Sequence, residues 1–360
     1  MYKLLLIDDT EHYAFQLKNE LEQLLEPSEV EIDVWVPKGS DNPRDTFNGL
    51  INPSTILVIT DYDLTSQGQT GLFGASIVDW CQSLAIPVGD FSRGQASNLP
   101  SEPNLFELRV PTSGGKSALF IASVFKGFLS LRKQLEGRPD LLSKRRPAGV
   151  LSAVLGVPEL ESQFALYGSR LTSSNGALLD KILKFTPIEV EPSTEEKQTL
   201  VAYIIGHLLL NSILKFPGPI LSIEGLGAYL ATSEHDEISI LFDAARYSGP
   251  FNELGPFFWL SKVDTLLDLW GEGLQAEFEY ESSGELNRSI IENQIKRPLS
   301  RNACSRCHGK NGGFLCPFTK RAICQLPTCS VSSSSWIPAG ARICRIERDF
   351  YDELAPILGM

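Results

Sequence analysis

Six of the seven cysteines in this 360-residue chain come after residue 303, and two of them form the motif Cys304-x-x-Cys307-His308. This motif is typical of two kinds of site, covalent attachment of c-type haem and one half of a zinc site. A haem iron of this type usually takes a second axial ligand, commonly Met or His. The two methionines are Met1 and Met360, and no histidine follows His308. The sequence therefore favours zinc over haem.

Four of the cysteines have the spacing C-x2-C-x16-C-x4-C: Cys304, Cys307, Cys324 and Cys329. This spacing is close to that of two paired thiolate turns that share one metal. Three further residues remain candidates for ligand positions: Cys316, Cys344 and His308. Because a complete set of four thiolates leaves no open coordination position, the zinc is predicted to be structural rather than catalytic.

A second group of potential metal ligands lies near the start of the chain. Asp8 and Asp9 follow the apolar run Leu4–Ile7, and Asp61 lies near the end of the apolar segment Ser54–Leu64. Such runs are typical of buried parallel strands, whose carboxyl ends lie at one edge of the sheet. Three carboxylates at one edge repel each other unless a hard cation such as Mg²⁺ lies among them. With the cation bound, one carboxylate can attack a phosphoryl group.

The elements that position these acids alternate between strand and helix over residues 1–135. Strands are expected at five places: Lys3–Asp9, Val30–Pro37, Ser54–Leu64, Ala85–Ser92 and Leu105–Pro111. Helices are expected at three: Thr10–Leu25, Leu72–Leu84 and Ser117–Leu135. This alternation predicts an α/β domain with a doubly wound, five-stranded parallel sheet.

Three segments of this domain resemble the receiver domain of two-component response regulators. They are Ile7–Asp9, Ile59–Leu64 followed by Gly71–Gly74, and Ile86–Ser92. The resemblance covers about the first third of the chain. It implies a phosphorelay function in which a partner kinase supplies the phosphoryl group.

The resemblance also implies a role for each acid. Asp8 and Asp9 would bind Mg²⁺ together with Asp61, which would be the phosphoacceptor. Asp63 is the rival of Asp61, but the family's acceptor is the first acid of a D-x-D-L pattern. Ser92 would be the hydroxyl that senses the phosphoryl group.

The sequence departs from the family pattern at two places. Both concern the parts that respond to phosphorylation and not the three acids. Arg109 stands where the family has a lysine before proline, and a guanidinium does not replace the shape of an ammonium; Lys116 fits that position less well. Residues Arg93–Asn104 have two prolines and no apolar periodicity, which indicates that the family's fourth helix is lost. The alternative to phosphotransfer is therefore a receiver fold retained as a docking scaffold.

The middle of the chain, residues 150–295, is predicted to be a mainly helical domain that follows a linker at Glu136–Gly149. A capping box at Ser193–Glu196 precedes an apolar helix that we expect to reach Phe216. Further helices are expected at three places: Ile223–Leu230, Glu237–Tyr247 and Phe257–Trp270. No motif for nucleophilic, nucleotide-binding or metalloprotease chemistry occurs here, so we expect no enzyme activity.

The last segment, residues 296–360, is predicted to be a small Cys-rich module with a charge opposite to that of the rest. Residues 296–349 contain ten Lys or Arg and two Asp or Glu, in a chain whose net charge is −12. These bases would either neutralise nucleic-acid phosphates or pair with acidic protein surfaces. The alternatives are thus a phosphorylation-gated nucleic-acid-binding regulator and an adaptor that binds a protein.

The adaptor is the leading hypothesis: an atypical response-regulator-like signalling protein that acts on a partner protein, a kinase or an effector. The combination of a receiver-like domain with a helical domain and a Cys-rich module suggests a bacterial stress or defence system. The apolar run Leu4–Ile7 is too short for a secretory signal. The most apolar stretch, Val201–Leu214, is too short and too polar to span a membrane. We therefore expect a cytoplasmic protein without membrane contact.

Overall fold

The computed structural model describes residues 1–39, 42–65, 72–91, 106, 108–111, 115–142, 146–168, 193–272, 283–309, 312–332 and 336–355. Contacts within the chain group it into two compact units. Unit 1 comprises Met1–Pro158 and Arg170–Leu208, and unit 2 comprises Glu159–Ser169 and Leu209–Met360. The expected linker therefore lies within unit 1, and residues 296–360 belong to the same unit as most of the helical middle.

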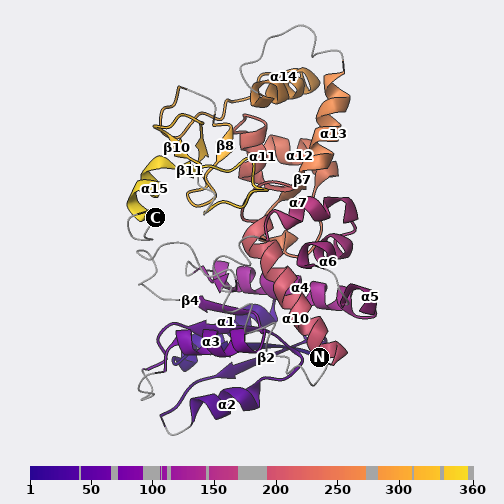
Figure 1. Ribbon diagram of the computed structural model, residues 1–360. Coiled ribbons are helices and arrows are strands. Elements are labelled where there is room, and N and C mark those ends of the chain that lie inside the picture. The colour runs from indigo at the N-terminus through magenta and orange to yellow at the C-terminus, as the bar shows by residue number, and fades with distance from the viewer. Residues whose placement is uncertain are drawn as a thin grey trace. The chain divides into compact units, whose positions relative to one another are not determined.

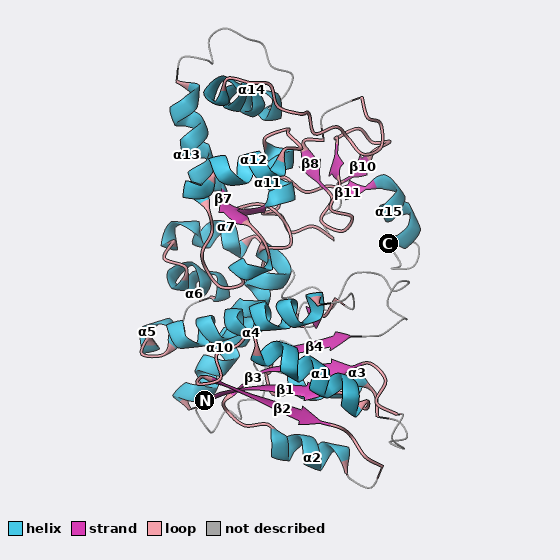
Figure 2. Ribbon diagram, turned by 180° about the vertical axis from the view of Figure 1, so that it is seen from behind, coloured by secondary structure: helices cyan, strands magenta, loops and turns pink. Residues whose placement is uncertain are grey.

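Unit 1 is built on a five-stranded parallel sheet with the strand order β2-β1-β3-β4-β5, as the sequence predicts (Figures 1 and 2). Its strands are β1 (Tyr2–Ile7), β2 (Val30–Trp35), β3 (Thr55–Asp61), β4 (Val88–Phe91) and β5 (Leu108–Arg109). The two most apolar strands, β1 and β3, lie next to each other and are almost wholly buried. Burial on both faces explains why their sequences are continuous apolar runs.

Four helices cover the two faces of this sheet: α1 (Glu11–Glu22), α2 (Pro43–Leu50), α3 (Gly74–Ser83) and α4 (Lys116–Leu135). Three more pack against α4 and against each other: α5 (Pro139–Leu142), α6 (Pro147–Val154) and α10 (Thr194–Leu208). Helices α2 and α3 meet through the rings of Phe47 and Trp80, 5.5 Å apart, over a core that includes Leu5 and Ile7. Helices α1 and α4 pack together on the face to which the alternate residues of β1 point.

Helix α2 is an element that the sequence analysis missed. Its apolar content is small, and Phe47 is its only fully buried side chain. A start signal is nevertheless present, because Asn42 caps the helix by accepting a hydrogen bond of 3.1 Å from the Arg44 amide, and Pro43 occupies the first turn.

Helix α10 begins at the predicted capping box. The Ser193 hydroxyl accepts a bond from the Glu196 amide (3.2 Å), and the Glu196 carboxylate accepts one from the Ser193 amide (2.8 Å). The α-helix was expected to reach Phe216, but it ends at Leu208 and continues as a π-helical turn, η3 (Leu209–Ile213). This change of helix type coincides with the passage of the chain from unit 1 to unit 2.

Unit 2 has more helix than strand, and its strands are short and paired. Its helices are α7 (Glu161–Ala165), α11 (Ile223–Tyr229), α12 (His235–Leu241), α13 (Leu260–Gly271), α14 (Ser283–Ile295) and α15 (Arg348–Leu354). Its strands are β6 (Ile220–Ser222), β7 (Phe257–Trp259), β8 (Phe314–Leu315), β9 (Ala322–Ile323), β10 (Ser330–Val331) and β11 (Ile346–Glu347). Short 3-10 turns occupy Pro158–Leu160, Asp243–Ala245 and Asn252–Leu254.

Two of the helices expected in the middle differ in the structure. The helix expected at Phe257–Trp270 begins only at Leu260, because three consecutive aromatic residues form strand β7, which pairs antiparallel with β6. The helix expected at Glu237–Tyr247 runs instead from His235 to Leu241. None of the described helices combines the length and apolar character that a membrane crossing requires.

The Cys-rich segment shares its core with the helices before it. Leu299, Leu315 and Ile343 belong to the same buried cluster as Leu226 and Ile291. Backbone hydrogen bonds join the two parts as well, since the Ser233 amide donates to Ser300 (3.1 Å) and the Asn302 amide donates to Ala231 (3.1 Å). The described residues between 296 and 355 are therefore part of the body of unit 2 and not an independent tail.

Candidate metal centres

The three predicted acids of unit 1 meet at one edge of the sheet. Asp8 and Asp9 follow β1, and Asp61 ends β3, the neighbouring strand. One oxygen from each carboxylate lies within 4.8 Å of the other two. Asp8 and Asp9 are only 2% and 5% exposed. The chain thus gathers three acids at the carboxyl ends of β1 and β3, which is the usual edge for a ligand in an open α/β sheet.

Local hydrogen bonds orient each of these carboxylates. The Thr10 amide donates to Asp8 Oδ1 (2.8 Å), and the Thr10 hydroxyl donates to Asp9 Oδ1 (3.3 Å). The Tyr62 amide donates to Asp61 Oδ1 (2.8 Å). These bonds fix one oxygen of each acid through the turn that follows its strand. The rival acid Asp63 bonds elsewhere, because its Oδ1 accepts bonds from the amide and the hydroxyl of Thr65 (3.1 and 2.6 Å).

The structure describes only some of the other residues to which the receiver resemblance assigns a role. Ser92 and the whole of Arg93–Asn104 lie outside the described residues. Arg109 is an exposed residue of β5 and pairs in register with Asp90 of β4. Its role as a substitute for the family's lysine stays a prediction.

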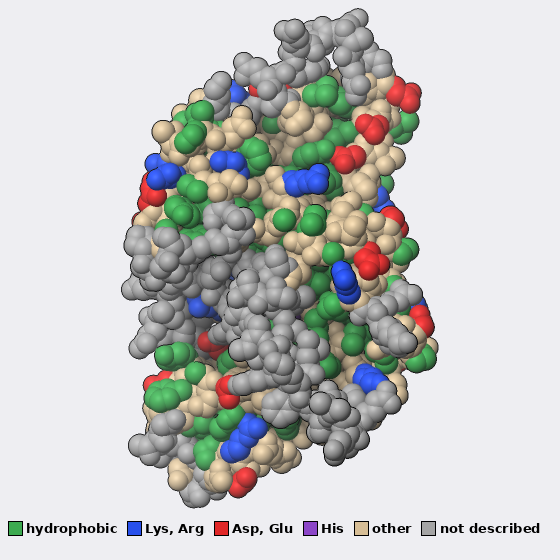
Figure 3. Space-filling view, viewed as in Figure 1, with side chains coloured by type: hydrophobic (Ala, Val, Ile, Leu, Met, Phe, Trp, Pro, Cys, Tyr) green, Lys and Arg blue, Asp and Glu red, His purple; other side chains and the backbone are tan. Residues whose placement is uncertain are grey.

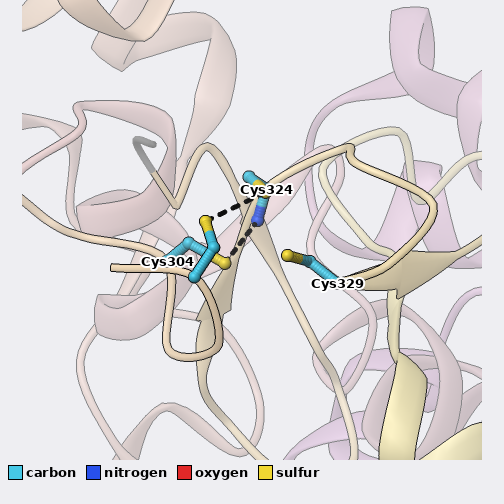
Figure 4. Close-up of side chains that lie close together, drawn as sticks. Cys304, Cys324 and Cys329 are labelled. Atoms are coloured by element: carbon cyan, nitrogen blue, oxygen red, sulfur yellow. Dashed lines mark hydrogen bonds between the residues drawn. The ribbon is translucent and has the colours of Figure 1, made fainter. Parts of the chain in front are cut away.

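The four predicted cysteines of unit 2 form a second cluster. One sulfur from each of Cys304, Cys307, Cys324 and Cys329 lies within 4.8 Å of the others. Figure 4 shows the side chains of Cys304, Cys324 and Cys329 converging on one space. The sulfurs of Cys307 and Cys324 are 3.9 Å apart. Four thiolates around zinc at 2.3 Å in a tetrahedron lie about 3.8 Å from each other, so the donor set fits that metal.

Turns and short strands bring these thiols together. Cys304 and Cys307 lie in a tight turn that the His308 amide closes on the Cys304 carbonyl (3.0 Å), with His308 in the left-handed region at φ 54°. Cys324 follows β9, and its amide donates to the Cys304 sulfur (3.3 Å). Cys329 precedes β10. The bond from the Cys324 amide ties the two halves of the four-cysteine cluster together.

The three further ligand candidates are not part of this group. The Cys316 sulfur accepts the Glu347 amide (3.4 Å), and the Cys344 thiol donates to the Pro217 carbonyl (3.8 Å). His308 closes the first turn through its backbone. A second turn, Cys316–Lys320, repeats the geometry of Cys304–His308, since the Lys320 amide donates to the Cys316 carbonyl (2.9 Å) and Lys320 has φ 59°. Thr319 stands where a second cysteine would be, so this turn supplies one thiol and no pair.

Burial affects the protonation of two thiols of the four-cysteine cluster, Cys324 and Cys329, before any metal binds. It raises the pKa of Cys324 to about 12 and raises the pKa of Cys329 above its ordinary value. Both groups are therefore protonated in the metal-free chain at neutral pH. A metal must displace these protons, so its affinity is expected to fall as the pH falls.

Several bases around the thiol cluster are paired within unit 2. Arg306 lies 2.8 Å from Asp349, and Arg321 lies 3.4 Å from the buried carboxylate of Glu347. On the face seen in Figure 3, the described Lys and Arg side chains are interspersed with Asp and Glu. The two ion pairs mean that Arg306 and Arg321 are engaged inside the protein and less available to a nucleic-acid backbone.

Comparison with protein-family models, with curated proteins and with solved structures gives no match for this chain. The function of the chain is therefore inferred from the geometry of the three carboxylates and the four cysteines.

Proposed function

We propose that the chain is a non-enzymatic signalling protein in which unit 1 accepts a phosphoryl group on Asp61 and unit 2, held by a structural zinc, contacts a partner protein. One observation carries the proposal: three carboxylates lie within 4.8 Å of each other at the carboxyl edge of a parallel sheet. Two of them, Asp8 and Asp9, are nearly buried. Like charges are costly in a buried environment unless a cation lies between them.

The chemistry follows from the placement of the acids. Bound Mg²⁺ would be held by Asp8, Asp9 and Asp61 and would neutralise charge on the phosphoryl oxygens. An oxygen of Asp61 forms a bond to phosphorus while the bond from phosphorus to the donor's nitrogen or oxygen breaks. The product is an acyl phosphate on the protein and a free donor group. The Asp61 side chain is oriented for this role by the Tyr62 amide.

Phosphorylation of Asp61 is expected in the presence of a small acyl phosphate and Mg²⁺. Intact mass spectrometry should show one added phosphoryl group on the wild-type protein and none on Asp61→Asn, which keeps the acceptor oxygen for the Tyr62 amide. Asp63→Asn is the matched control and should be modified like the wild type, because Asp63 is engaged by Thr65. An unmodified wild type would make unit 1 a docking scaffold, and modification that persists in Asp61→Asn would place the acceptor on another residue.

Gly74→Ala is expected to slow this phosphorylation by roughly tenfold or more, because small displacements at a reacting centre are costly. A Cβ at this position would lie 2.4 Å from the Asp61 carbonyl oxygen and would push the turn that carries the acceptor. Gly49→Ala is the control, since nothing lies within 4 Å of its Cβ. Rates of mass increase measure the effect, and equal rates for the two variants would contradict the role of this close approach.

The zinc proposal for unit 2 rests on the donor set. Four thiols within 4.8 Å, three of them buried, fit a tetrahedral four-thiolate site that has no position for a substrate. Zinc there would join the turn at Cys304 to the loop between Cys324 and Cys329. Because two of the bases nearby, Arg306 and Arg321, pair with acids of the same unit, a protein is favoured over a nucleic acid as the partner.

A further inference from the structure

One thiol of the four-cysteine cluster differs from the others in its exposure. All seven cysteines lie in the described part of the chain, and Cys307 alone among them is exposed to solvent. Cys304, Cys324 and Cys329 are 0%, 4% and 2% exposed. Cys307 is therefore the residue of the cluster at which a solvent-borne oxidant has the readiest access.

The exposed thiol has a close partner. The Cys307 and Cys324 sulfurs are 3.9 Å apart, and a disulfide needs about 2.05 Å. Cys324 is held in place, because its amide donates to the Cys304 sulfur and its carbonyl accepts the Ser330 hydroxyl (2.6 Å). Cys307 is exposed to solvent, and a movement of its side chain by roughly 2 Å would close the bond.

We propose that Cys307 is an oxidation site for hydroperoxides and that Cys324 resolves it, so that the zinc of unit 2 is released by oxidation. The inference rests on the proposed zinc site and adds its regulation. The Cys307 thiolate attacks one peroxide oxygen, the O–O bond breaks, and the second oxygen leaves as water or an alcohol after taking up a proton. The Cys324 sulfur then attacks the sulfenic sulfur, the S–O bond breaks, and the sulfenic hydroxyl leaves as water after taking up a proton. Two thiols are oxidised and one peroxide is reduced.

Loss of these two ligands removes half of the donor set. The two remaining thiols, Cys304 and Cys329, cannot complete a tetrahedron, and the zinc ion leaves. The segment that carries the cysteines shares a core with the helices of unit 2 through Leu315 and Ile343. Oxidation is therefore expected to loosen the unit that we propose binds the partner.

The test uses the full chain with its zinc bound. Hydrogen peroxide is added in the presence of a zinc-binding dye, and about one zinc ion per chain should be released. Trypsin digestion without reductant should then yield the peptide of residues 307–310 joined to that of residues 322–342. Fragmentation of the joined peptides should place the bond at Cys324 rather than Cys329. Reductant with added zinc should restore the metal content.

Two kinds of variant separate this chemistry from damage to the fold. Cys307→His keeps four ligands, because three cysteines and one histidine are a common ligand set for structural zinc. It should release zinc at least roughly tenfold more slowly than the wild type, since the exposed thiolate is gone. Cys344→Ser changes a buried thiol outside the cluster and should release zinc like the wild type.

The outcomes distinguish the two proposals. Zinc that is present but is not released by peroxide, or a disulfide between another pair, overturns the oxidation site and leaves the zinc site standing. Equal release from Cys307→His and the wild type overturns it as well. A purified chain without zinc overturns both.

Discussion

Removal of the zinc that we propose for the four-cysteine cluster is expected to unfold the whole of unit 2 while unit 1 keeps its structure. Structural zinc sites contribute roughly 10–16 kcal/mol of apparent binding free energy, which is as much as the entire stability of most domains. Leu299, Leu315 and Ile343 connect the Cys-rich segment to the helical core, so the loss of the metal cannot stay local. The two backbone bonds that join Ser233 to Ser300 and Ala231 to Asn302 would be lost with them.

Calorimetry with and without a chelator measures this effect. Two transitions are expected for the zinc-bound chain, and the chelator should abolish one of them, with elemental analysis giving about one zinc per chain before treatment. Cys304→Ser should behave like the chelated wild type, whereas Cys81→Ser, in the core of unit 1, should keep the zinc-dependent transition. Hydrogen exchange provides a second check. If the chelator made amide exchange faster only in residues 296–355, and not in the helices of unit 2, the role of the shared core would be contradicted.

Tyr167→Ala is expected to destabilise unit 2 by about 3–5 kcal/mol, the usual cost of removing a large aromatic side chain from a core. Tyr167 is fully buried, and its hydroxyl donates to the Phe216 carbonyl (3.0 Å). Its ring fills the space beside Gly218 and Gly340, where an added Cβ would lie 2.0 Å and 2.4 Å from the tyrosine. The truncation would therefore leave a cavity that two glycines cannot fill.

Urea unfolding of the zinc-bound protein checks the size of this effect. Tyr167→Phe keeps the ring and leaves the Phe216 carbonyl without this donor, so it should cost about 1 kcal/mol. Leu166→Ala is the matched control, because Leu166 is the adjacent residue and is 41% exposed; it should change stability by less than about 0.5 kcal/mol. A Tyr167→Ala protein as stable as Leu166→Ala would mean that this segment is not anchored in unit 2.

Much of the fold of unit 1 could be predicted from the sequence, because its signals are local. The apolar runs of β1 and β3 indicate buried parallel strands, and the edge at which their acids lie follows from that assignment. The spacing of the four cysteines likewise identified the residues that the fold brings together. The roles of these residues in phosphotransfer and in zinc binding stay predictions.

What escaped prediction depends on contacts between residues distant in sequence. The local sequence around Leu315 and around Ile343 cannot show that these two side chains enter a core with Ile291. The burial of Tyr167 depends on glycines about 50 and 170 residues later in the chain. The residues of strand β7 are apolar enough for either helix or strand, and the pairing of β7 with β6 decides between them. Helix α2 was missed although Asn42 and Pro43 signal its start.

The chain passes between the two units three times, after Pro158, after Ser169 and after Leu208. Neither unit therefore corresponds to one uninterrupted stretch of coding sequence. A recombination event with a single junction would separate α10 from α4, against which it packs, or Tyr167 from its pocket. Most domains can be exchanged between genes as contiguous cassettes. Unit 1 cannot, so the two halves of the protein have to be inherited together and to diverge as a pair.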